Sequence, residues 1–374
     1  MRNTRQTKIN IHRDAWVEIN ISNLENNIKE IKENIGQDVK LLGVVKADAY
    51  GHGAVMLAPT ILASGIDMLG VASIDEGVDL RQAGIDCDIL VLGAVPVWAV
   101  ESAVKNDLSI SIFSHDHIKA CEQAFNRTGI KPKVHIKIDT GMNRIGVSTS
   151  EAVEFIKEVQ GTPYINLQGI FTHLASAEEI DKTDEQFKKW DNIINSIVPE
   201  NLLLHIQNSA GTICYNVKNS NMRRVGICLY GLYPDFPEFE FKKPNLKQLI
   251  SLKGRIVNIH TAKDSEGVSY CHTYKAKGDR TIATVPIGYA DGVPRLLSNK
   301  ITATLNGVEI PQVGNITMDQ MMFDITGVKA NIGDVITLLD ENHPIDNWAK
   351  IVNTINYELT CRLKVRLPRV YTRG

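Results

Sequence analysis

The sequence predicts an α/β fold, a (β/α)8 TIM barrel followed by a mainly β C-terminal domain. Apolar runs alternate with segments of helical spacing from residue 41 onward. Eight such runs occur, and eight parallel strands close a barrel of this kind. After about Tyr233 the spacing changes to strand-like alternation, which predicts the second domain.

The expected barrel strands and helices follow one another through residue 229. The apolar runs lie at 41–45, 66–72, 88–93, 108–113, 133–138, 165–171, 202–207 and 223–229. Helical spacing occupies 75–83, 97–105, 115–127, 151–159 and 184–197 between them. Continuous apolar runs are typical of parallel strands that are buried on both faces, so we expect βαβ units.

A stretch with Pro234, Pro237 and Pro244 follows, and we interpret it as a linker. Strand-like segments then lie at 249–260, 267–274, 281–287, 301–310, 318–325 and 335–339, with a helix at 345–355 and a last strand at 364–372. We expect a barrel domain over 12–240 and a mainly β domain over 241–374. The early strand 15–20 is a candidate to pair with the second domain.

The composition excludes several classes of protein. The 374 residues carry a formal net charge of −2, so the chain lacks the basic surface that nucleic acid or an anionic membrane requires. Pro59, Gly65 and Asp67 interrupt the most apolar long segment, 54–73, so we expect no membrane span. The six cysteines form no Cys-x-x-Cys pair, and the polar N-terminus does not resemble a signal peptide. We expect a cytoplasmic protein that acts on a small molecule and holds no metal.

Polar residues end several of the apolar runs, and catalytic residues of barrels lie at the carboxyl ends of the strands. They are Lys46, Lys137 with Asp139, His173, Asn208 with Ser209, and Arg224. Each of these alone is more often structural. Because five strand ends share the feature, we expect an active site there.

The stretch around Lys46 indicates the chemistry most directly. A lysine at the end of a buried strand is a poor choice for packing because its ammonium must be desolvated or paired. In a partly dry cleft, a lysine becomes a nucleophile that forms Schiff bases with aldehydes. Gly51 and Gly53 allow a tight turn and close approach to a ligand. Without further information, a lysine that reaches out to solvent is the commoner case.

The nine residues 45–53 (Val-Lys-Ala-Asp-Ala-Tyr-Gly-His-Gly) resemble the pyridoxal-phosphate attachment signature of alanine racemases. The resemblance extends, in order, through residues 137–146, 173–178, 208–210, 224–227, 269–270, 288–292 and 318–320. It implies a pyridoxal 5'-phosphate-dependent amino-acid racemase, an isomerase that interconverts L- and D-alanine and supplies D-amino acid for peptidoglycan. It also implies a homodimer with shared active sites.

The resemblance assigns two bases on opposite faces of the substrate. Lys46 would hold the cofactor as a Schiff base and, once freed by the substrate amine, act on one face. Tyr270 would act on the other face from the partner subunit. A phenol is a weak acid, so a tyrosine base needs cationic surroundings near neutral pH. Without the resemblance, a half-buried strand aromatic is the commoner role for Tyr270.

Arg224 would face the pyridine nitrogen of the cofactor. An arginine donates but does not accept, so the ring nitrogen stays unprotonated and side reactions are discouraged. His173 would lie beside the ring and orient Arg224. Without the resemblance, Arg224 reads as a surface charge and His173 as a core histidine with satisfied hydrogen bonds.

The remaining roles concern the phosphate and the substrate. The phosphate would be bound by Tyr50, Ser209 and the backbone of Gly226 and Ile227, with Asn208 beside them, although Ser209 alone is also a good helix N-cap. Substrate and corridor contacts would come from Arg144, Met318, Asp319, Tyr289, Arg295 and Glu178. Lys137 matches a lysine that is often carbamylated in the family and would brace Arg144.

The sequence departs from the family at Val365, where a tyrosine usually narrows the space around the substrate methyl group. A valine widens that space, and apolar pockets discriminate weakly between side chains that differ by one group. The alternative hypothesis is therefore a serine racemase or a broader alanine/serine racemase. Three further alternatives are a cofactor-binding barrel without activity, a decarboxylase of the same two-domain plan, and an aldolase that uses a lysine Schiff base.

Overall fold

The computed structural model describes residues 12–36, 39–197 and 201–374. The chain divides into two compact units, one formed by residues 23–247 and the other by residues up to 22 together with 248–374. The second unit thus combines the beginning and the end of the chain.

The first unit is a barrel of parallel strands. In sequence order these are β2 (Lys40–Val44), β3 (Met68–Val71), β4 (Ile89–Val91), β5 (Ser109–Ile112), β6 (Lys133–Asp139), β8 (Asn166–Phe171), β9 (Leu203–His205) and β10 (Met222–Val225). From β2 to β9, successive strands of this series are neighbours in the sheet, and β10 pairs with β2 at the other end of the order. Two backbone hydrogen bonds join the segments around β9 and β10, Asn221 N to Leu204 O and Arg224 N to Gln207 O. The barrel is therefore nearly closed, as predicted.

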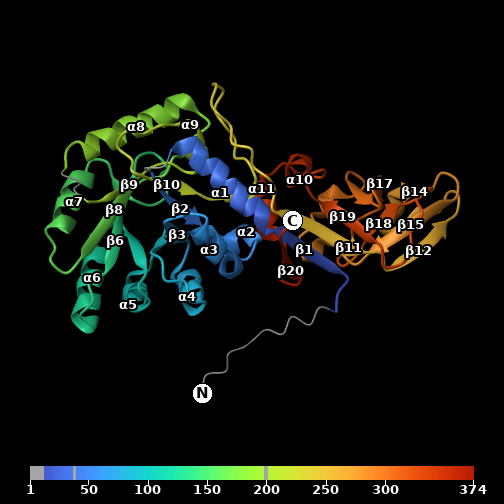
Figure 1. Cartoon of the computed structure of the whole chain (residues 1–374), viewed down its shortest axis with the longest axis horizontal. Helices are drawn as coiled ribbons and strands as arrows, with labels where there is room; N and C mark the ends of the chain where they lie inside the picture. The colour runs from blue at the N-terminus through green and yellow to red at the C-terminus, as the bar shows by residue number, and fades with distance from the viewer. Residues whose placement is uncertain (1–11, 37–38, 198–200) are drawn as a thin grey trace, which may run out of the picture. The chain divides into compact units, whose positions relative to one another are not determined.

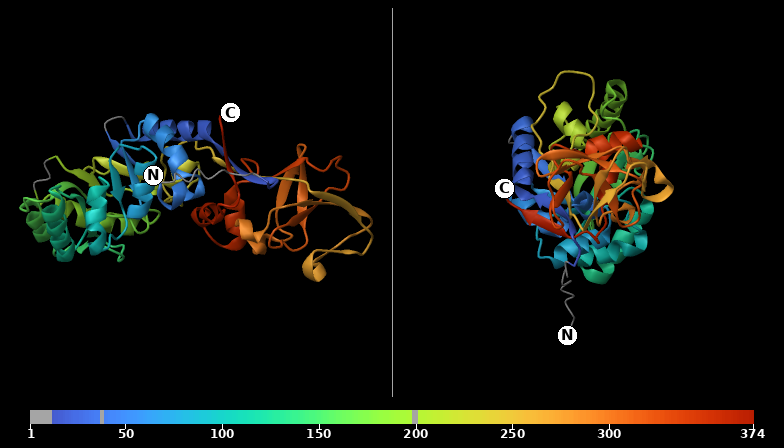
Figure 2. Two further views of the ribbon diagram at one scale, coloured as in Figure 1. Left: turned by 90° about the horizontal axis from the view of Figure 1, so that it is seen from below. Right: turned by 90° about the vertical axis from the view of Figure 1, so that its right-hand side faces the viewer.

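Helices surround these strands (Figure 1), and Figure 2 shows the same arrangement from two other directions. They are α1 (Ile21–Ile35), α2 (Lys46–Gly51), α3 (Ala54–Ala63), α4 (Ile74–Gln82), α5 (Val100–Lys105), α6 (His115–Thr128), α7 (Ala152–Gln160), α8 (Ile180–Ile194) and α9 (Ser209–Cys214). Short pieces add β7 (Val147–Ser148), η1 (Val97–Ala99) and η2 (Ile227–Tyr230). The central strands are buried along their whole length, which explains their continuous apolar sequence.

The second unit is built on a nine-stranded sheet in the order β12-β15-β18-β17-β16-β19-β11-β1-β20. Its strands are β1 (Ala15–Asn20), β11 (Ile250–Arg255), β12 (Asn258–Ala262), β15 (Arg280–Val285), β16 (Thr302–Leu305), β17 (Val308–Val313), β18 (Met321–Asp324), β19 (Val335–Leu339) and β20 (Arg369–Thr372). Burial alternates along β1, β11 and β16, as expected when a strand has one face on the core. The early strand β1 lies between β11 and β20 in this sheet.

The remaining elements of this unit show where local patterns mislead. They are β13 (Gly267–Val268), β14 (Tyr274–Lys275), η3 (Tyr270–His272), η4 (Tyr289–Asp291), η5 (Arg295–Leu297), α10 (Ile345–Val352) and α11 (Asn356–Arg362). The expected strand 267–274 is two short strands around a turn, and 249–260 is divided between β11 and β12. The sequence pattern missed α11. In the described part of the chain, no helix is both long and apolar enough to cross a membrane.

Candidate active site

Lys46 follows the end of β2 and begins an unusual turn. Ala47, Asp48, Ala49 and Tyr50 have φ values of 51°, 54°, 54° and 54°, which is the left-handed region. That conformation costs about 1–2 kcal/mol for each residue other than glycine. Such strain persists only where surrounding contacts enforce it, and it is typical of functional sites.

Polar contacts enforce the turn from both sides. Glu76 of α4 accepts hydrogen bonds from the backbone N–H groups of Ala47, at 2.8 Å, and Ala72, at 2.7 Å. The Asp48 carboxylate accepts one from Ala54 N at 2.7 Å. The turn that begins at Lys46 is thereby tied to the starts of α3 and α4.

Aromatic packing supports the same turn from inside. The Tyr230 side chain is fully buried, and its hydroxyl donates a hydrogen bond to Val44 O at 2.8 Å. Its ring stacks on His52 at a centroid distance of 4.6 Å and contacts the Tyr50 ring at 5.1 Å. His52 Nδ1 lies 2.9 Å from Ala49 O. The position of Lys46 therefore depends on residues far from it in the sequence.

Arg224 of β10 is almost fully buried and held by two histidines. Its guanidinium lies 3.0 Å from His205 Nδ1 and 3.1 Å from His173 Nδ1. It also donates hydrogen bonds to the carbonyls of Thr172, His205 and Ile206. Because arginine only donates, both Nδ1 atoms must accept and both histidines are neutral. Burial and the charge of Arg224 lower the pKa of each histidine, in agreement with that assignment.

All these contacts use the terminal nitrogens of Arg224. Within the described residues, Nε of Arg224 has no hydrogen-bond partner, although it is not a fully buried atom. Burial lowers the pKa of Arg224 to about 9, so the group stays largely charged near neutral pH. The side chain is thus rigidly oriented, with one cationic N–H donor left for a ligand.

Lys137 of β6 lies in the same part of the barrel. Burial, together with the positive charges of Arg224, Arg144 and Lys46, lowers its pKa to about 7, although the Asp139 charge acts to raise it. Its Nζ lies 5.2 Å from the centroid of the Phe171 ring. Four cationic side chains therefore gather near one another, which favours an anionic ligand.

The loop after β6 orients Arg144. Asp139 accepts hydrogen bonds from the backbone N–H groups of Gly141, Asn143 and Arg144 at 2.9–3.0 Å. Burial would raise the pKa of Asp139, but these hydrogen bonds hold it below its ordinary value. The Asp139 carboxylate thus binds the backbone of the loop, and the exposed Arg144 side chain can contact a ligand.

A crowded cradle lies near the end of β10. Ser209 is buried and its hydroxyl accepts a hydrogen bond from Gly226 N at 2.9 Å. A Cβ atom at Gly226 would lie 2.4 Å from the Tyr50 hydroxyl oxygen, so only glycine fits there. Asn208 caps α9 by accepting from Gly211 N. The hydroxyl groups of Tyr50 and Ser209 therefore meet beside the Gly226 backbone, with Ile227 next in the chain, and hydroxyl groups gathered in this way suit a phosphate.

The second group of predicted residues lies in the β unit. Tyr270, Met318 and Val365 are exposed by 71%, 54% and 89%. The backbone N–H groups of Tyr289 and Ala290 donate to Thr317 O and Met318 O, each at 3.0 Å. Tyr289 and Met318 are thus brought together. The corridor residues Arg295 and Glu178 are exposed, Arg295 in this unit and Glu178 in the barrel.

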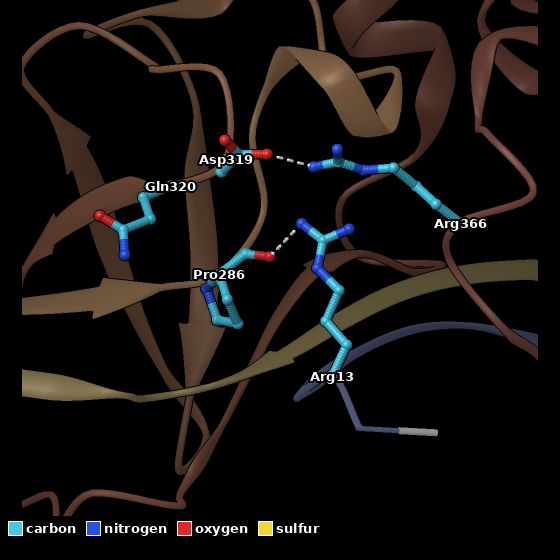
Figure 3. A pocket seen from close by; sticks show the side chains of 5 residues that line it. All are labelled: Arg13, Pro286, Asp319, Gln320 and Arg366. Atoms are coloured by element: carbon cyan, nitrogen blue, oxygen red, sulfur yellow. Dashed lines mark hydrogen bonds and ion pairs between the residues drawn. The ribbon is translucent and has the colours of Figure 1, made fainter. Parts of the chain in front are cut away.

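Asp319 belongs to a charged cluster that sequence reasoning did not find. Its carboxylate pairs with Arg366, which also donates to Asp291 at 2.6 Å. Asp291 is fully buried and binds Arg13 as well. Figure 3 shows Arg13 and Arg366 side by side along a pocket of about 340 Å³, with Asp319 facing Arg366. Arg366 follows Val365 directly, so this cluster anchors two predicted substrate positions.

Sequence reasoning also missed His205 and Tyr230. His205 lies inside the apolar run 202–207, where an ionisable side chain is unusual, and could have been found by that signal. Tyr230 lies inside a wholly apolar stretch, and nothing local distinguishes it from an ordinary core aromatic residue.

Comparison with known proteins identifies the family. The sequence models described as "Alanine racemase, N-terminal domain" and "Alanine racemase, C-terminal domain" match residues 19–234 and 249–371. The chain belongs to the alanine racemase family. The predicted resemblance is thus confirmed, and with it the prediction of an isomerase.

Individual members are similar over nearly their whole length. "Alanine racemase 1" of Oceanobacillus iheyensis is 40% identical, and the match covers 97% of this chain and 100% of the relative. The structure of an alanine racemase from Clostridium difficile has a TM-score of 0.90 at 37% identity and covers 96% of each chain. An alanine racemase from Bacillus anthracis "with bound L-Ala-P" has a TM-score of 0.87 at 34% identity, covering 97% of this chain and 96% of that one.

Proposed function

We propose that this protein interconverts L- and D-alanine with pyridoxal 5'-phosphate as cofactor. The observation that carries the proposal is the cationic cluster at the barrel strand ends, with Lys46 in an enforced turn and Arg224 held by two neutral histidines. The donors fit the cofactor. The Tyr50–Ser209–Gly226 cradle suits its phosphate, and the Nε–H of Arg224 suits its ring nitrogen.

The residues of the chain would divide the work as follows. When bound, the cofactor supplies an aldehyde carbon that takes the substrate amine and a ring that withdraws electrons from the α-carbon. Lys46 Nζ takes or returns the α-proton on one face. Tyr270 of the partner subunit takes or returns it on the opposite face. Arg224 would donate a hydrogen bond to the ring nitrogen without giving up its proton, and the ring would then withdraw electrons less strongly, which would disfavour decarboxylation and transamination.

Alanine is preferred to the serine alternative for a specific reason. The relatives described above carry the alanine racemase name over nearly the full length of this chain. Arg144, with the Met318 backbone and Asp319, would bind the substrate carboxylate region. Carbamylation of Lys137 would convert one cation of the cluster into an anion that attracts Arg144.

The first experiment follows optical activity. The purified protein with pyridoxal phosphate should racemise L-alanine and D-alanine, and L-serine more slowly. Lys46→Ala should abolish both the reaction and the covalent cofactor absorbance. If neither amino acid is racemised while cofactor is bound, the proposal is wrong and a cofactor-binding protein or decarboxylase is favoured.

The shared active site can be tested by mixing two inactive variants. In a mixed dimer of Lys46→Ala and Tyr270→Phe chains, one of the two sites would combine an intact Lys46 with an intact Tyr270. Random mixing should therefore restore about a quarter of the native activity. No recovery in verified mixed dimers would show that Tyr270 acts within its own chain. The supply of D-amino acid for peptidoglycan and a cytoplasmic location stay predictions.

A further inference from the structure

The turn that carries Tyr270 is strained. Ser269, Cys271 and His272 have φ values of 67°, 61° and 44°, which are rare for residues other than glycine. Tyr270 lies between them. Its backbone direction is therefore not one that the local sequence prefers, and contacts from elsewhere in the unit must hold it.

The Tyr270 side chain does not fix its own direction. It is 71% exposed. Across the residues that the structure describes, the phenol makes no hydrogen bond and the ring no aromatic contact. Within this unit, the backbone of the turn fixes the point and the direction from which the side chain leaves the chain.

Asn315 holds that backbone at two consecutive residues, Ser269 and Tyr270. Its Nδ2 donates a hydrogen bond to Tyr270 O at 2.7 Å, and its own carbonyl accepts one from Ser269 Oγ at 2.6 Å. Asn315 is buried, with 8% exposure. A buried amide whose donor is committed to a single carbonyl acts as a fixed point for an exposed neighbour.

Residues near Asn315 also hold the turn that carries Tyr270. Gly314 has a φ of 74°, and a Cβ there would lie 2.6 Å from Val268 O, so the two segments are in direct backbone contact. Asn299 accepts from Gly314 N at 2.6 Å and donates to Thr273 Oγ1 at 3.1 Å. Both ends of the turn are therefore tied to residues 314–315.

We propose that Asn315 is a positioning residue that aims the Tyr270 phenol for proton transfer. This proposal rests on the proposed function, in which Tyr270 is the second base. Asn315 does not touch the substrate; it acts through the Tyr270 backbone. Segment 314–315 leads directly to Met318 and Asp319. The contacts of residues 314–315 with the turn therefore also fix the position of the Tyr270 backbone relative to these predicted substrate contacts.

The test compares the two faces of the substrate. In D2O, exchange of the α-hydrogen of each alanine enantiomer is followed by NMR for the pyridoxal-phosphate-loaded enzyme. Tyr270→Phe identifies the enantiomer whose exchange depends on Tyr270. Asn315→Ala and Asn315→Asp, which both remove the amide donor, should slow exchange of that enantiomer about 10- to 100-fold. Exchange of the other enantiomer, KM and cofactor absorbance should change little.

Two further variants keep the result interpretable. Ser269→Ala removes only the second hydrogen bond and should show a smaller effect with the same enantiomer preference, even if Asn315→Ala folds poorly. Asn347→Asp, at an exposed position of α10, should change neither rate. Equal slowing of both enantiomers, or none, in the Asn315 and Ser269 variants overturns the positioning role. If Tyr270→Phe slows α-hydrogen exchange of both alanine enantiomers equally, or of neither, the proposed two-base function is wrong, and the test says nothing in favour of Asn315.

Discussion

The fully buried Tyr230 hydroxyl offers a sharp test of how the fold holds Lys46. Tyr230→Phe keeps the ring that contacts His52 and Tyr50 and removes the hydroxyl that donates to Val44 O. A lost hydrogen bond to a buried carbonyl costs about 1–3 kcal/mol. We expect the free energy of unfolding to fall by that amount.

Tyr230→Phe should also slow the attachment of the cofactor to Lys46, beyond what its lower stability explains. Four left-handed residues follow Lys46, and they store about 4–8 kcal/mol of conformational strain. Releasing the strand end that precedes them lets the turn relax. Since about 1.4 kcal/mol corresponds to a factor of ten, we expect covalent attachment of pyridoxal phosphate to slow by at least about tenfold.

The assay mixes cofactor-free protein with pyridoxal phosphate and follows the absorbance of the attached cofactor, with urea unfolding measured in parallel. Tyr233→Phe is the matched control, because the Tyr233 hydroxyl donates to Pro244 O at 2.8 Å and accepts from Leu246 N at 3.0 Å, and neither partner belongs to the strand or turn that carries Lys46. The control should lose stability and keep the native attachment rate. If Tyr230→Phe also attaches cofactor at the native rate despite lost stability, the turn does not depend on Tyr230 and the reasoning is refuted.

Four further changes have defined outcomes. Gly226→Ala, whose Cβ would lie 2.4 Å from the Tyr50 hydroxyl, should weaken pyridoxal phosphate binding at least about tenfold by titration, and unchanged affinity would contradict the cradle. Asp291→Asn should lower the free energy of unfolding by about 1–3 kcal/mol at pH 7. It removes the charge of a fully buried carboxylate, but its partners Arg13 and Arg366 are 25% and 40% exposed, so solvent weakens the pairing. A loss under about 1 kcal/mol would show that the pair is dispensable. The pKa of Lys137 is about 7 in the fold and ordinarily 10.5, so the unfolded chain binds more protons between these values. The free energy of unfolding of the cofactor-free protein should therefore rise as the pH rises from 7 toward 10.5. The urea midpoint of Lys137→Met should not show this rise with pH. Val365→Tyr should reduce serine turnover relative to alanine, and an unchanged ratio would remove Val365 from the substrate pocket.

Much of the fold follows from local pattern. The barrel strands are short apolar runs because both faces of each strand are buried, and runs such as 41–45 and 133–138 correspond to β2 and β6. The sequence also predicts the strand at 15–20 as a candidate to pair with the second domain. In the structure this strand, β1, pairs there with β11 and β20. The candidate residues at the strand ends were also visible in the sequence, because a lysine or arginine that stops an apolar run is unusual.

The misassigned segments have a common physical cause. Residues 267–274 read as one strand because Val, Tyr and Thr favour strands, yet Ser269, Cys271 and His272 adopt positive φ. Propensity reports what a residue prefers in isolation. Contacts with residues 299 and 314–315, distant in the sequence, override it.

The sequence by itself determined the fold class, the family and the identity of the polar strand ends, because burial periodicity and residue chemistry are local properties. Only the tertiary structure decided how those groups are held. The left-handed turn after Lys46, the two neutral histidines that fix Arg224 and the buried Asp291 that joins Arg13 to Arg366 all depend on contacts between segments far apart in the chain. Hydrogen bonds and ion pairs of that kind leave no periodic trace in the sequence, since each needs only one residue at one position.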